Sequence, residues 1–162
     1  MIVVADTSPL NYLICPGYVW ILPELLGKVL VPQAVLSEML HPQAPAAVRT
    51  FATSLPSWLE QGKVIRIIPG LDPSLGEGER EAISLALEIR ADALLIDDLA
   101  GRREAHSRRI AARGTLAALL QASLRRHLDF PTAFAQLKQP GFRVSRELEE
   151  SIFDGYNKGQ LG

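Results

Sequence analysis

Hydrophobic residues along the chain form two patterns, short unbroken runs and longer stretches in which they recur every three or four positions. Unbroken runs predict strands that are buried on both faces, as in a parallel sheet between helices. The recurring pattern predicts amphipathic helices. We expect strands at residues 2–5, 28–31, 63–68, 93–96 and 109–112. We expect helices at residues 8–13, 18–26, 33–41, 46–59, 77–90, 102–108, 115–127, 130–137 and 145–153.

This alternation of strands and helices indicates the fold class. Strands that alternate with helices build a sheet with helices packed on its faces. We therefore predict a three-layer α/β/α sandwich with a central, mainly parallel sheet. A chain of 162 residues is most simply one domain, which we place at residues 1–154. Residues 155–162 are expected to form a loose C-terminal tail.

Composition limits the protein class only broadly. The chain is 48% hydrophobic and 22% charged, and its net charge of -1 gives no indication of a polyanionic partner. Cys15 is the only cysteine, which excludes an internal disulfide and fits a reducing compartment. No apolar run is long enough to span a membrane, and no basic segment precedes the first strand. We therefore expect a cytoplasmic protein that does not contact a membrane.

Carboxylates follow two of the predicted strands at the point where each strand ends. Asp6 comes directly after the run 2–5, and Asp97 and Asp98 follow the run 93–96. Ligands of parallel α/β sheets bind beyond the carboxyl ends of the strands. We therefore expect these three carboxylates to share one site at that edge of the sheet.

Two predicted helices add acidic residues to the same candidate site. Glu38 lies on or beside the apolar face of its helix. Glu79 shares a face with apolar residues such as Ile83, where a carboxylate needs a partner or a cation. Glu81 shares a face with Ser84 that we expect to be wetter, so Glu79 is the better candidate.

A divalent cation would offset the repulsion among these acids. Carboxylates brought together repel one another and raise each other's pKa. Oxygen ligands suit hard ions such as Mg²⁺ or Mn²⁺. Zinc would require His or Cys ligands, and the three histidines have no ligand spacing with Cys15. The candidate cofactor is therefore Mg²⁺ or Mn²⁺.

Four short motifs, in this order along the chain, resemble the PIN domain, in particular the VapC-type toxins and a group beside them. They are Val-Ala-Asp-Thr-Ser at 4–8, Val-Pro-Gln-Ala-Val-Leu-Ser-Glu at 31–38, Gly-Glu-Arg-Glu-Ala-Ile at 78–83 and Leu-Ile-Asp-Asp at 95–98. The match in motif order spans residues 2–120, and residues 141–145 are a further likeness.

This resemblance implies a Mg²⁺- or Mn²⁺-dependent ribonuclease, acting as the toxin of a toxin–antitoxin pair. The catalytic residues it implies are Asp6, Glu38, Glu79, Asp97 and Asp98, and all of these except Glu38 are implied metal ligands. The choice between Asp97 and Asp98 stays open, as does the choice between Glu79 and Glu81. Implied partners are an RNA substrate, a possible cognate antitoxin protein and a second copy of the chain. The apolar segment 18–26 also favours a homodimer.

Arginines are concentrated directly after Asp98. Seven arginines and a single acid, Glu104, lie between Leu99 and His127. Such a concentration could hold a phosphate backbone, or it could form a solvated face or salt bridges, including one between Arg102 and Asp98. The candidate nucleic-acid contacts are Arg102, Arg103, Arg108 and Arg109.

Two other functions remain open. Haloacid-dehalogenase-type phosphatases and receiver-type domains also place aspartates at strand ends. The first would need an aspartate where Ser8 stands, and the second a lysine at the end of a late strand. A PIN-fold binding module without catalysis is the other alternative. Thr7 or Ser8 could hydrogen-bond a ligand carboxylate or the phosphate. We expect one of them instead to cap the first helix, since such residues are preferred there.

Overall fold

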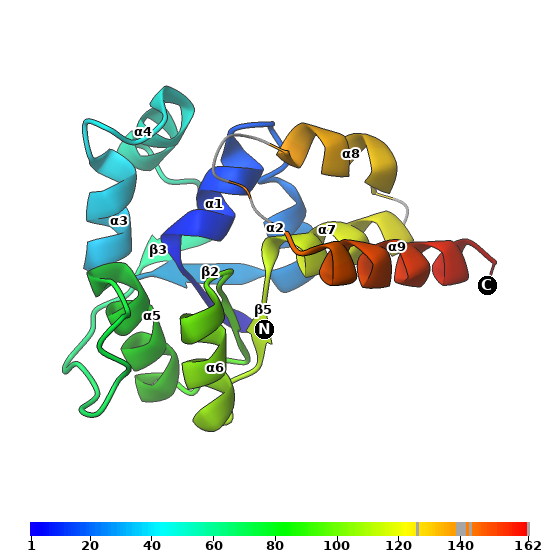
Figure 1. The fold of residues 1–162 in the computed structure, drawn as a ribbon. Helices are drawn as coiled ribbons and strands as arrows, with labels where there is room; N and C mark the ends of the chain where they lie inside the picture. Colours follow the sequence, from blue (N-terminus) through cyan, green and yellow to red (C-terminus); the bar gives the residue numbers. More distant parts are fainter. Residues whose placement is uncertain (126, 139–141, 143, 162) are drawn as a thin grey trace.

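The computed structural model describes residues 1–125, 127–138, 142 and 144–161 (Figure 1). Within these residues, five strands form one parallel sheet in the order β3-β2-β1-β4-β5. A single parallel sheet flanked by helices confirms the predicted fold class. The strands are β1 (Ile2–Ala5), β2 (Lys28–Val31), β3 (Leu59–Gln61), β4 (Ala93–Leu95) and β5 (Ala112–Arg113).

Helices cover both faces of this sheet (Figure 1). Two of them, α5 (Glu77–Glu88) and α6 (Leu99–Ser107), pack on one face. The core on the other face is built with α1 (Thr7–Ile14), α2 (Ile21–Leu26), α3 (Gln33–Leu40), α4 (Ala46–Thr53), α7 (Thr115–Leu124) and α8 (Phe130–Leu137), and α9 (Arg146–Leu161) packs against it.

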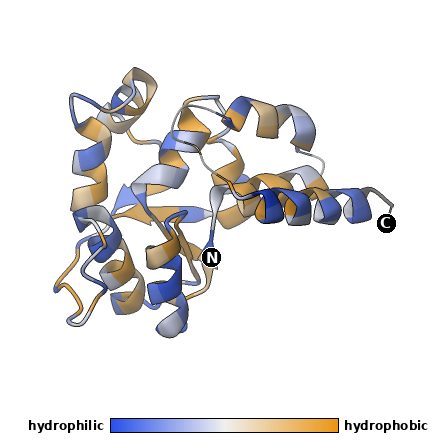
Figure 2. Ribbon diagram, in the orientation of Figure 1, coloured by the Kyte–Doolittle hydropathy of each residue, from blue (hydrophilic) through white to orange (hydrophobic). Residues whose placement is uncertain are grey.

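Each central strand contributes side chains to two hydrophobic cores. On β1, Val3 and Ala5 belong to the core that contains α1 and α7, and Val4 belongs to the core that contains α5. The helices in turn carry hydrophobic and hydrophilic residues on different sides (Figure 2). Burial on both faces explains why β1 and β4 appear in the sequence as unbroken apolar runs.

The third strand lies earlier in the chain than predicted. The prediction at 63–68 is wrong, because Leu59 pairs with Val29 in the sheet and Ile65 is 84% exposed. The backbone N–H groups of Ile65 and Arg66 instead donate to the Glu88 carboxylate. A side chain thus satisfies backbone groups that a strand would have paired.

Several helix boundaries also differ from the predictions. The helix predicted at 46–59 ends at Thr53, ahead of Pro56, and the helix predicted from residue 18 begins at Ile21. The strand predicted at 109–112 is β5 at 112–113, and α7 ends at Leu124 rather than at 127.

The C-terminal residues continue a helix instead of forming the loose tail expected for 155–162. Helix α9 extends to Leu161, and its aromatic residues Phe153 and Tyr156 pack against Phe130 with ring centroids 5.2 and 5.4 Å apart. Packing against α7 and α8 therefore stabilises a segment whose glycines had indicated disorder.

The apolar segment 18–26 is used mainly within the chain itself. Ile21, Leu22, Leu25 and Leu26 are buried in the core, and Trp20 is 42% exposed. This segment therefore supplies less surface for a homodimer than its composition suggested. Among the described residues, none of the helices is long and apolar enough to cross a membrane.

The aromatic cluster around Phe130 gives a stability prediction. Phe130, the first residue of α8, is fully buried and packs against Phe153 of α9. Phe130→Ala should therefore lower the free energy of unfolding by about 3–5 kcal/mol. The half-exposed Leu40 is a control, and Leu40→Ala should cost less than about 1 kcal/mol. Urea denaturation followed by circular dichroism measures both. Equal costs for the two substitutions would contradict the docked position of α9.

Candidate metal and nucleic-acid site

The order of the strands places the carboxyl ends of β1 and β4 side by side at a topological switch point. The chain passes from β1 to β2 and β3 on one side, then crosses to β4 on the other side of β1. Ala5 pairs with Leu95, and the Asp6 N–H donates to the Leu95 carbonyl at 2.9 Å. Asp6 and Asp97 therefore emerge next to each other, at the position where ligands bind in such sheets.

Asp6 is the buried acid of this edge. Its side chain is only 3% exposed, and burial is the main cause that raises its pKa from 3.8 to about 7. The backbone N–H of Thr7 lowers this pKa, whereas the negative charges of Glu79, Glu38 and Asp97 raise it. The structure thus brings together carboxylates from four separate parts of the sequence.

Asp97 and Asp98 are held by the starts of two different helices. Both oxygens of Asp97 accept hydrogen bonds from Thr115, at 2.7 Å from its N–H and 2.6 Å from its hydroxyl. Asp98 caps α6 by accepting the Gly101 N–H at 2.8 Å, which explains why α6 begins at Leu99 and not at residue 102 as predicted. The negative charge of Asp97 raises the pKa of Asp6, and the negative charge of Asp98 raises the pKa of Glu79.

Of the two candidate glutamates on α5, Glu79 faces this site. Glu79 lines a cavity with Asp97 and Asp98, and its carboxylate accepts the Gly76 N–H at 2.7 Å. Burial raises the pKa of Glu79. Glu81 accepts the Ala34 N–H at the start of α3, at 2.8 Å.

The reason given for preferring Glu79 was incomplete. Ser84 and Leu85, on the face of Glu81 that we expected to be wetter, are fully buried. The two glutamates differ in their neighbours, because Glu81 contacts α3 whereas Glu79 lies at the edge of the sheet. The spacing within α5 could not show this, because it depends on where α3 packs.

Glu38 connects the starts of α1 and α5. Its carboxylate accepts hydrogen bonds from the Thr7 hydroxyl and, at 3.2 Å, from the Gly78 N–H. Glu38 lies outside the cavity that Glu79 lines, although its negative charge raises the pKa of both Asp6 and Glu79. The expectation that Thr7 or Ser8 caps the first helix was wrong, because Asp6 holds the cap position.

The donor set fits a hard divalent cation in its chemistry. The charged groups that act on Asp6 are all carboxylates, whose oxygens Mg²⁺ and Mn²⁺ prefer as ligands. Among the described residues, no three acidic, His or Cys side chains lie close enough together to hold a metal ion as they stand. Glu38, Glu79, Asp97 and Asp98 each accept a hydrogen bond from a backbone N–H group at or beside the start of a helix.

A cavity of 530 Å³ opens beside the acids. Glu79, Asp97 and Asp98 line one side, together with Arg102 from α6. The positive charge of Arg102 lowers the pKa of Asp97, whereas burial raises it. Gly114 is needed at this point, because a Cβ atom there would lie 2.6 Å from Arg102 Nη1 and 2.9 Å from Asp97 Oδ1. Arg102 therefore faces Asp97 and not Asp98, the partner suggested by sequence spacing.

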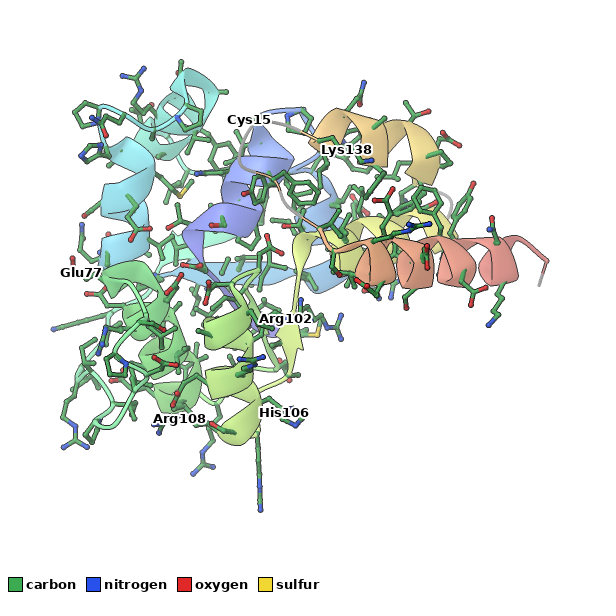
Figure 3. All side chains as sticks on the ribbon, viewed as in Figure 1. Cys15, Glu77, Arg102, His106, Arg108 and Lys138 are labelled. Atoms are coloured by element: carbon green, nitrogen blue, oxygen red, sulfur yellow. The ribbon has the colours of Figure 1, made fainter. Side chains whose placement is uncertain are left out.

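The four candidate arginines occupy different surroundings. Arg102 lies near the start of α6 and Arg108 at its C-terminal end (Figure 3). Arg102 and Arg103 line a second surface depression with His106. Arg108 forms a salt bridge with Glu104 at 2.7 Å, and Arg109 follows the C-terminal end of α6 with φ 61°. That end lies roughly 14 Å from the start of a helix of this length, where the acids are.

The sequence raised Thr7 as a possible hydrogen-bond partner of a ligand carboxylate, and its hydroxyl donates to Glu38. Thr115, which holds Asp97, was not singled out from the sequence. Position carries the only signal for it, since it begins a helix directly after a strand and one linking residue. Of the segment 141–145, Gly141 and Arg143 lie outside the described residues.

Comparisons with known proteins agree with this architecture. A family model described as the PIN domain matches residues 2–158. A PilT N-terminus domain protein from the hyperthermophilic archaeon Sulfolobus solfataricus P2 has a similar structure, with 13% sequence identity and a TM-score of 0.50 over 90% of this chain and 100% of that chain. At this identity the likeness shows the fold alone. No curated protein matches the sequence significantly.

PIN domains are generally nucleases, and they generally bind divalent metals. The matching family model covers nearly the whole chain, including all the acids described above. The chain belongs to the PIN domain family.

Proposed function

We propose that this chain is a Mg²⁺- or Mn²⁺-dependent ribonuclease that hydrolyses phosphodiester bonds in RNA. The observation that carries the proposal is the burial of Asp6 among the charges of Glu38, Glu79 and Asp97 at the switch point of the sheet. A bound cation would offset the repulsion within this group. Membership of the PIN family makes nuclease chemistry the general expectation, in place of the phosphatase and receiver alternatives.

The acids divide into metal ligands and a positioning group. Asp6, Glu79, Asp97 and Asp98 would hold the cation, and Glu38 would keep the starts of α1 and α5 together. The cation would supply an activated water and would offset charge on the attacking and leaving oxygens. Thr115 fixes the direction of the Asp97 carboxylate through two hydrogen bonds.

Arginines on α6 would hold the RNA backbone. Arg102 lines both the cavity beside the acids and the depression that contains Arg103 and His106. A guanidinium group binds phosphate oxygens in a bidentate manner, so these side chains could hold phosphates on one side of the scissile bond. Arg108 is bound to Glu104, and Arg109 lies at the far end of α6, so we assign neither a direct contact.

The biological role proposed is that of a cytoplasmic VapC-type toxin with a cognate antitoxin protein and a homodimeric state. This part rests on the resemblance of the four motifs to the VapC-type toxins. Light scattering measures the oligomeric state. Growth arrest on expression, absent for an inactive variant, measures toxicity. A monomer at micromolar concentration would reject the dimer, and normal growth would reject the toxin role.

Removing the charge of Asp6 should stabilise the metal-free protein at high pH. The pKa of this carboxyl is raised to about 7 in the folded state. The neutral carboxyl therefore contributes its full stability to the folded protein below about pH 4, and this contribution is lost as the pH rises through 7. In EDTA, Asp6→Asn should therefore raise the free energy of unfolding by about 2 kcal/mol or more at pH 8. Its effect at pH 4 should be small. Asp154→Asn, on the exposed surface of α9, is the control and should change little at either pH.

The same substitution should abolish cleavage of RNA. Asp6→Asn removes the central carboxylate of the proposed metal site, whereas Asp154→Asn should leave activity unchanged. The assay is Mg²⁺- or Mn²⁺-dependent cleavage of single-stranded RNA, with hydrolysis of a small phosphate ester measured in parallel. Full activity of Asp6→Asn would refute the metal-site assignment. Hydrolysis of the ester alone would favour a phosphatase, and neither activity would favour a non-catalytic binding module.

Two arginines of α6 should respond differently to truncation. Arg103→Ala should weaken RNA binding and lower the salt dependence of binding by about 0.7 per lost phosphate contact, the value for single strands. Arg108→Ala should leave binding unchanged and cost about 1 kcal/mol of stability, because it removes a partly buried ion pair with Glu104. Fluorescence anisotropy in a salt series measures binding. The assignment fails if Arg108→Ala weakens binding more than Arg103→Ala does.

A further inference from the structure

The cavity beside the acids has a second wall that the proposed hydrolysis does not use. Its apolar side is built from α7 and α9 and from Phe142 and Val144, with Leu116, Leu148 and Ile152 among the lining residues. At 530 Å³, the cavity falls in the range of about 300–1,000 Å³ that is typical of small-molecule sites. The lining of the cavity therefore combines charged residues with hydrophobic ones.

Aromatic rings form part of this apolar side. Tyr12 and Phe142 both line the cavity, with ring centroids 4.8 Å apart and an angle of 76° between their planes. Leu99 and Leu148, which also line it, are 61% and 44% exposed, values that are high for leucine. Rings and exposed leucines on the wall of one cavity are suited to a flat, uncharged, aromatic group.

We propose that the apolar side of this cavity binds one unstacked nucleobase of the RNA strand whose backbone passes the carboxylates. The inference rests on the proposed ribonuclease function and adds to it a site for one base of the substrate. In RNA, each phosphate is joined through a ribose to a base. A phosphate held at the acids and Arg102 therefore carries its own base into the same cavity. The base is the only part of a nucleotide that matches the hydrophobic wall.

A base can enter this cavity only if it is unpaired, so the cavity distinguishes single-stranded from double-stranded RNA. A base within a duplex is stacked and paired, so it cannot enter a cavity of this kind without leaving the helix. Bases of single strands, loops and bulges can be turned outward and packed against aromatic side chains. The base site therefore accepts an unpaired base next to the scissile phosphate, as the single-stranded RNA of the cleavage assay supplies, and a duplex should be cleaved poorly.

Ala117 offers a way to fill the pocket without disturbing the acids. It is an exposed residue of α7 that lines the cavity, so Ala117→Phe places a ring in the space assigned to the base. Ala47 is an exposed residue of α4, a helix that contributes nothing to the cavity. Ala47→Phe makes the same change in a helix elsewhere and is the matched control.

The test measures binding of the nucleosides adenosine, guanosine, cytidine and uridine to the full chain in EDTA, by ligand-observed NMR. Nucleosides carry no phosphate, so binding is independent of the cation and of cleavage. At least one should bind, and Ala117→Phe should weaken its affinity about tenfold or more, as loss of base stacking does. Ala47→Phe and Asp6→Asn should bind it as the wild type does. Ribose 5-phosphate should not bind in EDTA.

Cleavage assays separate this inference from the proposed function. Ala117→Phe should lower kcat/KM for single-stranded RNA about tenfold or more, whereas Ala47→Phe should not change it. If RNA is cleaved but no nucleoside binds and Ala117→Phe cleaves normally, the base pocket is refuted and the ribonuclease stands. The apolar wall would then belong to another ligand, such as a protein segment. If nucleosides bind as predicted but RNA is not cleaved, the proposed function fails and the base site stands.

Discussion

The buried negative charge of Asp6 is the constraint on which the rest of the site depends. A carboxylate that is almost completely removed from water is costly unless it is protonated or paired with a cation. No basic side chain is among the groups that shift the pKa of Asp6, and three of those groups are acids. The fold therefore maintains a concentration of negative charge at the end of its central strand, which is the condition that a divalent cation relieves.

Helix starts keep the surrounding acids in place. Asp97 accepts from the first residue of α7, Asp98 accepts from the first turn of α6, and Glu79 accepts from the residue that precedes α5. Helix N-termini carry unpaired N–H groups and partial positive charge, which favour carboxylates. Together with the charge of Arg102 near Asp97, these contacts help to hold several like charges at one edge of the sheet.

The sequence predicted those features that depend on local pattern. The apolar runs ending at Asp6 and before Asp97 identified the central strands, because burial on both faces leaves a pattern that needs no knowledge of partners. Features that depend on packing were not predictable in this way. Helix α9 is stabilised by contact with Phe130, which lies outside it in the sequence. The segment 63–68 does not form a strand, and the backbone N–H groups of Ile65 and Arg66 donate to the Glu88 carboxylate instead.

The candidate site shows the same division. Motif order made Glu79 and the aspartates candidates for the site. The positions of Thr115 and Arg102 beside Asp97 depend on how α6 and α7 approach it, which motif order does not show. Spacing alone suggested Asp98 as the partner of Arg102, because residues four apart meet on a helix. The start of α6 at Leu99 changes this, since Asp98 becomes a helix cap and its carboxylate turns to Gly101.

The central claim is that a divalent cation binds where Asp6 is buried, and a Mn²⁺ titration followed by electron paramagnetic resonance tests it directly. Because the pKa of Asp6 is about 7, the cation must displace a proton at pH 6 but not at pH 8. The account predicts Mn²⁺ binding that is about tenfold weaker at pH 6 than at pH 8. Absence of binding at pH 8, or equal affinity at the two pH values, would contradict it.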